Sequence, residues 1–184
     1  VAIQRRRDQF LRDTGAVGTL SSAPLAATAN GRYPFDEAVL VVRQVTWTPD
    51  LTGLPLQLLR TDEWAANNFA PAWLPPSNFQ LAYSTSVTPP LFVQLLPPPL
   101  NDGTLDLLTI NKGAVIDPLV SAPLGIPDDW AWVVKYGALA DLLQGDGLAL
   151  DPARAAYCQS RWDEGVLQAK TAPVVLTGRI NNTT

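Results

Sequence analysis

The chain contains no histidine, and this absence removes a large class of active sites. Its 184 residues also include a single cysteine, Cys158. Nucleophilic catalysis by serine or cysteine relies on an imidazole base, and most zinc sites use histidine or several cysteines. The chain also lacks a Walker loop, a GxGxxG fingerprint and a GxSxG motif. We therefore predict that it is not an enzyme and holds no catalytic residue, cofactor or metal.

Methionine, a second cysteine and long apolar runs are missing as well. A lone cysteine cannot form an intrachain disulfide, which fits a reducing compartment, and we expect Cys158 to be buried. The apolar runs are too short to cross a bilayer, and no signal peptide is visible, so we expect no membrane partner. Since the chain starts at Val1 without any methionine, we expect its natural N-terminus to lie elsewhere.

Charge is scarce too. Charged residues make up 16% of the chain and hydrophobic residues 47%, whereas soluble domains usually carry about a quarter charged residues. This composition suits a subunit whose surface is partly covered by neighbours, although a secreted β-rich domain shares it. The net charge of −4 argues against a protein that coats nucleic acid, because phosphate contacts need lysine and arginine.

The positive charge that is present gathers near the start of the chain. Arg5, Arg6 and Arg7 are consecutive, and Arg12 follows within two helical turns. One interpretation is a solvated helix face. The other is a docking surface for an acidic protein or for passing DNA.

Helical signals lie at the two ends of the chain. Ile3, Phe10 and Leu11 predict a helix from residue 1 to about 13 that ends at Gly15. Pro127 with two aspartates predicts a helix over 127–143, and Asp151-Pro152 predicts another over 151–170. The second helix has an apolar stripe made of Ala155, Cys158, Trp162, Val166 and Ala169.

The middle of the chain, roughly 20–125, predicts strands. It holds 14 of the 17 prolines, which block helix interiors and central strands. Val39–Trp47 has the best alternation, and Leu56–Arg60 and Leu91–Leu96 are shorter runs. The turn signal at 101–103 predicts a hairpin from 91–96 to a return strand at 105–110. Segment 61–80 is expected to be a loop or short helix anchored by Trp64, Phe69, Trp73 and Phe79.

These segments predict an α+β fold in one domain, 1–184. We expect a small helical bundle, made of the N-terminal helix and a C-terminal αα-hairpin, with a Pro-rich antiparallel β insertion. The helical frame comprises 1–15 and 126–170, and the insertion comprises 20–125. Residues 171–184 are expected to form an extended arm, free or donated to a neighbour.

Paired acids and six tryptophans are the remaining candidates for a site. Asp62-Glu63, Asp128-Asp129 and Asp163-Glu164 could in principle serve glycosidase or magnesium chemistry, but each fits a cap, turn or solvated face. The tryptophans could line a carbohydrate groove, or they could anchor the core and interfaces. Trp130 and Trp132 should point to different helix faces, one toward the core and the other toward a neighbour or the β insertion.

The order of these features resembles the neck adaptor (head-to-tail connector, head completion) proteins of tailed phages. The best match is IPDDWAWVVKYGALADLLQGDGLALDPARAAYCQSRWDEGV at 126–166, in which a proline-started helix carries a small-residue patch and a D-P-opened helix follows. QFLRDTG (9–15), VVRQVTW (41–47), FAPAW (69–73) and LFVQLLPPPLNDGTLDLLTI (91–110) are similar to further parts of the family. The apolar run at 174–176 has no counterpart in the resemblance.

The resemblance implies a virion structural protein at the head–tail junction, assembled in the host cytoplasm. It implies a homo-oligomeric ring, expected to be a dodecamer, which binds the portal protein and tail or other neck proteins. Genomic DNA would pass through the lumen without sequence-specific binding, and an acidic lumen would suit such sliding. The alternatives are another tail or minor virion structural subunit, and a carbohydrate-binding module. The candidate interface residues are Arg5, Arg6, Arg7, Arg12, Trp130, Trp132, Tyr136, Trp162, Val174 and Leu176.

Overall fold

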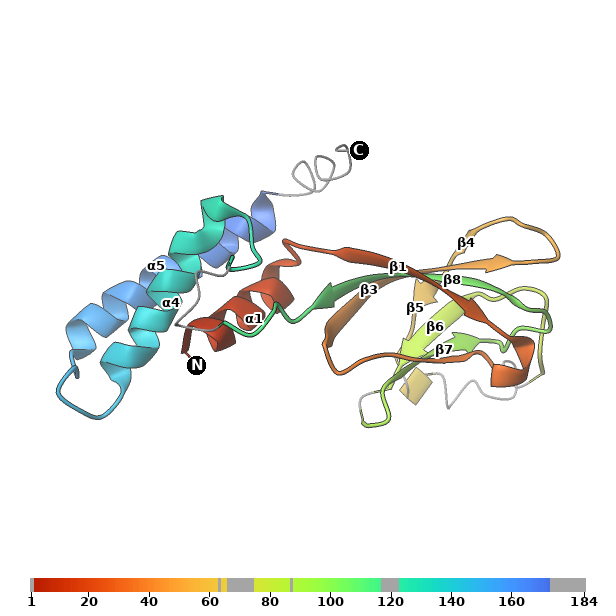
Figure 1. The fold of residues 1–184 in the computed structure, drawn as a ribbon, viewed down its shortest axis with the longest axis horizontal. Coiled ribbons are helices and arrows are strands. Elements are labelled where there is room, and N and C mark those ends of the chain that lie inside the picture. Colours follow the sequence, from red (N-terminus) through yellow and green to blue (C-terminus); the bar gives the residue numbers. More distant parts are fainter. Residues whose placement is uncertain (1, 63, 66–74, 87, 117–122, 173–184) are drawn as a thin grey trace. The chain divides into compact units, whose positions relative to one another are not determined.

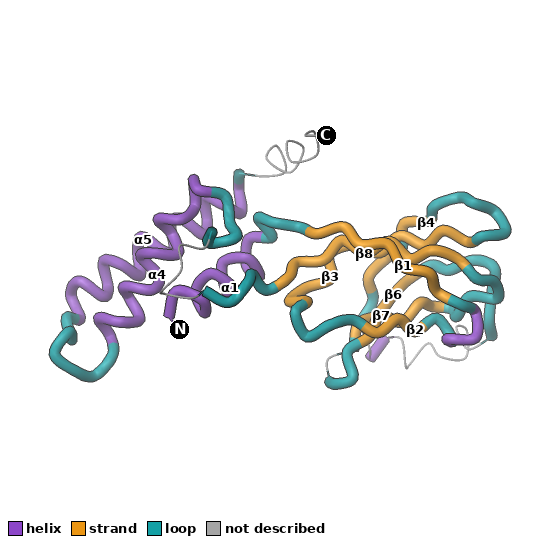
Figure 2. The backbone as a smooth tube through the Cα atoms, in the orientation of Figure 1, coloured by secondary structure: helices purple, strands orange, loops and turns teal. Residues whose placement is uncertain are grey.

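The computed structural model describes residues 2–62, 64–65, 75–86, 88–116 and 123–172. These residues form two compact units (Figure 1). The helical unit combines the two ends of the chain, Val1–Gly18 and Asn111–Thr184, and the β unit is the continuous segment Thr19–Ile110. Figure 2 shows that helices dominate the first unit and strands the second.

The helical unit contains the helices that the sequence predicts. They are α1 (Ala2–Thr14), the 3-10 turn η2 (Asp128–Trp130), α4 (Ala131–Gln144) and α5 (Pro152–Thr171). Helix α1 ends as expected, with the Gly15 N–H donating to the Leu11 carbonyl at 2.9 Å. Helix α5 begins at its predicted cap, because the Asp151 side chain accepts from the Arg154 N–H. All five residues of the predicted α5 stripe are buried.

Helices α4 and α5 form the expected antiparallel hairpin, and α1 packs on both (Figure 1). Two glycines allow the hairpin to close tightly. A Cβ at Gly137 would lie 2.4 Å from the Trp162 ring, and one at Gly165 would lie 2.4 Å from Val133. Both distances are shorter than any tolerated carbon contact, so each helix presents bare backbone to a large side chain of the other.

The β unit consists of two four-stranded sheets. One has the order β1-β8-β3-β4 and the other β2-β7-β6-β5. The strands are β1 (Thr19–Leu25), β2 (Arg32–Pro34), β3 (Val39–Pro49), β4 (Leu56–Gln57), β5 (Leu59–Arg60), β6 (Ala82–Thr85), β7 (Phe92–Leu96) and β8 (Gly103–Asn111). One buried cluster draws on both sheets, with Val45, Trp47 and Leu105 from the first and Tyr83 and Val93 from the second. The core of the β unit therefore lies between the sheets.

The predicted architecture of a small helical bundle with a β insertion is wrong. Strands hold about 29% and helices 36% of the described residues, and the β part has two four-stranded sheets and its own core. The pairing is not purely antiparallel either, because β5 runs parallel to β6. The chain is α+β with a β unit that is no minor insertion.

One strand pairing and one strand run predicted from the sequence are also wrong. The turn at 101–103 does not close a hairpin, because β7 and β8 belong to different sheets. The run Leu56–Arg60 is divided between β4 in the first sheet and β5 in the second, and Leu58 between them is buried. In both places the chain crosses from one sheet to the other and does not pair with the preceding strand.

Strand β3 confirms the predicted strand at 39–47, but the alternation of buried and exposed side chains is interrupted in the middle of the strand. Val42 is buried and so are Val45 and Trp47, whereas Arg43 and Gln44 between them are both exposed. A regular alternation would have placed Arg43 on the same face as Val45. The inward face therefore shifts by one residue along this strand.

Candidate functional site

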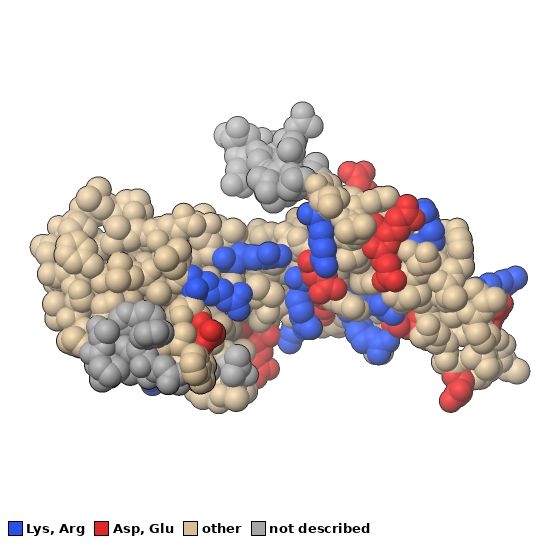
Figure 3. Space-filling model, turned by 180° about the vertical axis from the view of Figure 1, so that it is seen from behind, with Lys and Arg blue, Asp and Glu red and all other residues tan. Residues whose placement is uncertain are grey.

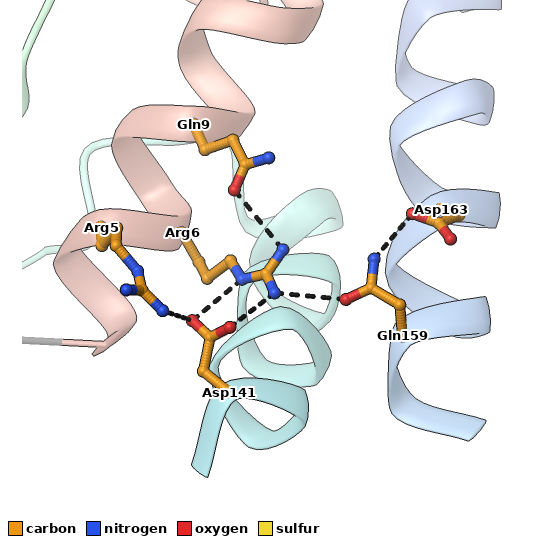
Figure 4. Close-up of polar contacts among 6 residues, drawn as sticks. All are labelled: Arg5, Arg6, Gln9, Asp141, Gln159 and Asp163. Atoms are coloured by element: carbon orange, nitrogen blue, oxygen red, sulfur yellow. Dashed lines mark hydrogen bonds and ion pairs between the residues drawn. The ribbon is translucent and has the colours of Figure 1, made fainter. Parts of the chain in front are cut away.

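The main polar cluster of the helical unit joins its three helices around Arg6 (Figure 4). The Arg6 guanidinium from α1 donates to both carboxylate oxygens of Asp141 on α4, at 3.0 Å from Nε and 2.6 Å from Nη2. It also donates to the Gln159 side chain on α5 at 3.2 Å. Its cationic face lies 5.0 Å from the centre of the Trp162 ring. This two-pronged pairing with a planar carboxylate fixes direction as well as distance, so Arg6 holds α1 against the hairpin.

The other arginines of the consecutive triplet face different surroundings. Arg7 is 1% exposed and donates to the Gly113 and Ala114 carbonyls at 2.8 and 2.6 Å, with Asp8 as its ionic partner. Arg5 contacts Asp141 from outside, with 68% of its side chain exposed. Arg12 is exposed. The triplet is thus not one solvated face, and the accessible positive charge of α1 comes from Arg5 within the triplet and from Arg12 beyond it.

Asp141 has an unusual electrostatic environment. Burial alone would raise the pKa of its carboxyl group, but hydrogen bonds and charge from Arg6 and Arg5 outweigh burial and hold the pKa below its usual value. A carboxylate with a depressed folded-state pKa stabilises the fold above its unfolded pKa. That contribution is lost as the pH falls through the folded pKa.

We therefore expect an Asp141→Asn variant to be less stable than the parent at pH 7 by about 2 kcal/mol, in keeping with charged hydrogen bonds. The gap should shrink below about pH 4, because there the carboxyl group of the unfolded parent binds a proton that the folded state still excludes. Urea unfolding at a series of pH values, followed by circular dichroism, measures this gap. Asp146→Asn, an exposed residue between α4 and α5, is the matched control. A gap that stays constant from pH 7 to pH 2.5 (roughly the acid limit of such a titration) would contradict the assignment.

The predicted aromatic residues divide between two sides of the hairpin. Trp162 is 3% exposed, and its ring and that of Trp130 each lie 6.3 Å from Phe10 on α1. Trp132 instead contacts Tyr136, with ring centres 6.2 Å apart. The expectation that Trp130 and Trp132 point to different faces is confirmed, with Trp130 on the side of α1.

The second side forms what we call the aromatic–arginine patch, made of Trp132, Tyr136, Tyr157 and Arg161. Tyr136 and Tyr157 meet edge to face at 6.1 Å, and the Arg161 guanidinium lies 5.1 Å from the Trp132 ring centre. Tyr157 keeps 59% of its surface exposed. Arg161 also pairs with Glu164. A half-exposed group of aromatic rings around an arginine has the composition of a protein interface.

Sequence reasoning singled out Trp132 and Tyr136 but missed Tyr157, Arg161, Asp141 and Gln159. Asp141 could have been found from the sequence, since it is the one acidic residue of α4, a helix made mostly of apolar residues. Such a residue at a helix–helix contact needs a cationic partner. Val174 and Leu176 lie outside the described residues, as do Phe69 and Trp73.

The paired acids occupy caps and surfaces. Asp128 and Asp129 start η2, and the Asp62 side chain accepts from the Ala65 N–H at 2.6 Å, while Glu63 lies outside the described residues. Asp163 and Glu164 accept from side chains of their own helix. Within the described ranges, no three His, Cys, Asp or Glu side chains gather as a metal site would require. Cys158 is buried, as predicted.

Charge is shared unequally between the two units. The β unit carries three arginines and seven acidic residues, so the whole formal charge of −4 belongs to it. The helical unit carries ten of each sign. On the face drawn in Figure 3, charged atoms crowd the helical unit, and most of the β unit is uncharged. Among the described helices, none combines the length and apolar character that crossing a membrane requires.

Neither the scan of protein-family models nor the comparison with curated proteins gives a match for this chain.

Proposed function

We propose that the chain is a structural subunit of a tailed phage that forms the head-to-tail adaptor ring beneath the portal. The observation that carries the proposal is the structure of residues 126–166, the segment with the strongest resemblance to neck adaptors. This segment is a closed helix hairpin that α1 locks through Arg6, and it displays the aromatic–arginine patch on one side. A rigid helical element with a half-exposed aromatic surface suits docking on a large partner.

The charge distribution supports the same role. A channel through which DNA must move should not bind phosphate. An acidic, charge-poor β unit would not bind phosphate where it faced such a channel. The carbohydrate-binding alternative loses support, because Trp47 and Trp162 are in cores and Trp130 packs on Phe10. Another virion or tail structural subunit stays as the second candidate, since the exposed leucines of the β unit, such as Leu51 and Leu59, suit any subunit assembly.

The test is a binding experiment between the purified chain and isolated portal rings of the phage that encodes it. We expect co-sedimentation and, in electron micrographs, an added ring on one face of the portal. The substitution Tyr157→Lys, at an exposed member of the aromatic–arginine patch, should weaken binding about tenfold or more, as loss of a hot spot does. Leu51→Lys on the β unit is the matched surface control and should bind normally.

Two results would overturn the proposal. One is a chain that shows no binding to portal rings at any accessible concentration. The other is binding to isolated tails in the absence of any portal affinity, which would favour the second candidate.

A further inference from the structure

Strand β1 is the longest of the four edge strands in the two sheets. It has seven residues, Thr19–Leu25, and pairs on one side with β8 through a continuous antiparallel register. It ends its sheet in the order β1-β8-β3-β4. Beyond that ladder, no backbone hydrogen bond reaches Leu20–Pro24 from elsewhere in the described part of the chain. One side of β1 therefore presents unpaired N–H and C=O groups.

The other three edge strands are protected in the ways that natural sheets use. Strands β4 and β5 have two residues each and β2 has three, and β2 and β5 also carry Arg32 and Arg60. Short or charged edges resist the addition of another strand. Strand β1 (TLSSAPL) has no charge, and its single proline, Pro24, stands near its end. Residues 19–23 are thus an unguarded edge.

The side chains along β1 also lack cover. Leu20 is 70% exposed, and Thr19, Ser21 and Ser22 are exposed as well. Leu20 lies opposite Leu108 of β8, so an apolar side chain on a further strand would extend this row. Small hydroxyl side chains at 21 and 22 leave room for such a strand.

The chain itself contains a segment suited to this edge. Twelve residues follow Ala172, PVVLTGRINNTT, and half of them are β-branched, the class most favoured in strands. The segment has no acidic residue and carries Arg179, whereas the β unit carries −4. On β8, Asp106 lies opposite Ser22 and bonds its hydroxyl, so a negative charge stands one strand in from the edge. The signs of the two charges are complementary.

Length permits the pairing between copies. Twelve extended residues span about 40 Å, and five of them, about 17 Å, match residues 19–23. The remaining residues would be available as a linker to α5 of the donating copy. Alternate side chains of Val174–Thr177 would place an apolar residue beside Leu20.

We propose that residues 173–184 of one copy add a strand to the free edge of β1 in a neighbouring copy. This inference rests on the proposed function in one respect, namely that the partner is a second copy held in the same ring. Strand addition supplies affinity through main-chain hydrogen bonds, and alternate side chains supply its specificity.

Disulfide trapping between differently tagged full-length chains tests the pairing. One chain carries Ser21→Cys, and the other carries Val175→Cys or Leu176→Cys, so a shift of one residue in register does not hide the contact. The control chain carries Gln57→Cys, an exposed position on β4 at the opposite edge of the same sheet. Because a disulfide needs Cβ atoms within about 4.5 Å, we expect at least about tenfold more mixed dimer with Ser21→Cys than with Gln57→Cys.

A second pair of variants tests the edge itself. Leu20→Lys adds the kind of charge that guards natural edges, and it should reduce trapping at Ser21→Cys about tenfold. Leu51→Lys changes an equally exposed leucine away from β1 and should leave trapping unchanged. Equal trapping at the two edges, or trapping insensitive to Leu20→Lys, would overturn the inference.

The two proposals fail in different ways. Rings that form on the portal without β1 trapping would reject the strand addition and leave the adaptor function standing. Trapping between copies without portal binding would reject the adaptor function and keep the pairing.

Discussion

Replacing Trp162 by alanine should lower the free energy of unfolding of the helical unit by about 3–5 kcal/mol, the range for large aromatic residues in a core. The indole is 3% exposed, meets Phe10 edge to face, and fills the space against the bare backbone of Gly137. Its removal leaves a cavity that the hairpin cannot fill without moving a helix. It also removes the ring on which Arg6 lies. Urea unfolding followed by circular dichroism at the helical band measures the loss.

Tyr157→Ala provides the control for this experiment. Tyr157 is an aromatic residue of the same helix, but it is 59% exposed. Its removal should cost less than about 1 kcal/mol, as for most surface substitutions. Equal losses in the two variants would show that Trp162 does not hold the hairpin together as described.

Replacing Trp47 by alanine should destabilise the β unit by a similar amount, about 3–5 kcal/mol. Trp47 lies on β3, is completely buried, and belongs to the cluster shared by both sheets. A Cβ at Gly103 would lie 2.6 Å from its ring, so the indole packs directly on the start of β8. Hydrogen exchange of the β3 and β8 amides measures the loss strand by strand.

Leu51→Ala is the matched control, because this leucine follows β3 closely in the chain but is 72% exposed. Protection of the β3 and β8 amides should hardly change in it. Unchanged protection in Trp47→Ala as well would contradict the position of Trp47 at the centre of the core.

The helices could be predicted from the sequence because their signals are local. The Gly15 end of α1, the Asp151 cap of α5 and the α5 stripe each depend on residues within a few turns. The sheets depend on partners that are distant in sequence. Val93 and Leu95 of β7 belong to the same buried cluster as Leu105 and Leu107 of β8, although the two strands lie in different sheets. A turn signal alone could not distinguish this arrangement from a hairpin.

The candidate site was predictable in part, for a similar reason. Trp162 was marked by its place in the helical stripe. Arg6 and Asp141, by contrast, are 135 residues apart, and no local pattern relates them. The predicted helix did imply that the three arginines would differ, because successive residues of a helix are turned by about 100° and so point in three directions. Arg5, Arg6 and Arg7 accordingly have three different environments.

The separation of Arg6 from Asp141 bears on how the chain is made. A ribosome adds about 5–20 residues per second, so α1 leaves it on the order of ten seconds before α4 is complete. The whole β unit, continuous in sequence, emerges in that interval and can form its core from its own residues. Helix α1 has no helical partner during this time. The Arg6–Asp141 pair can therefore form only after α4 has left the ribosome, when the whole β unit has already been made.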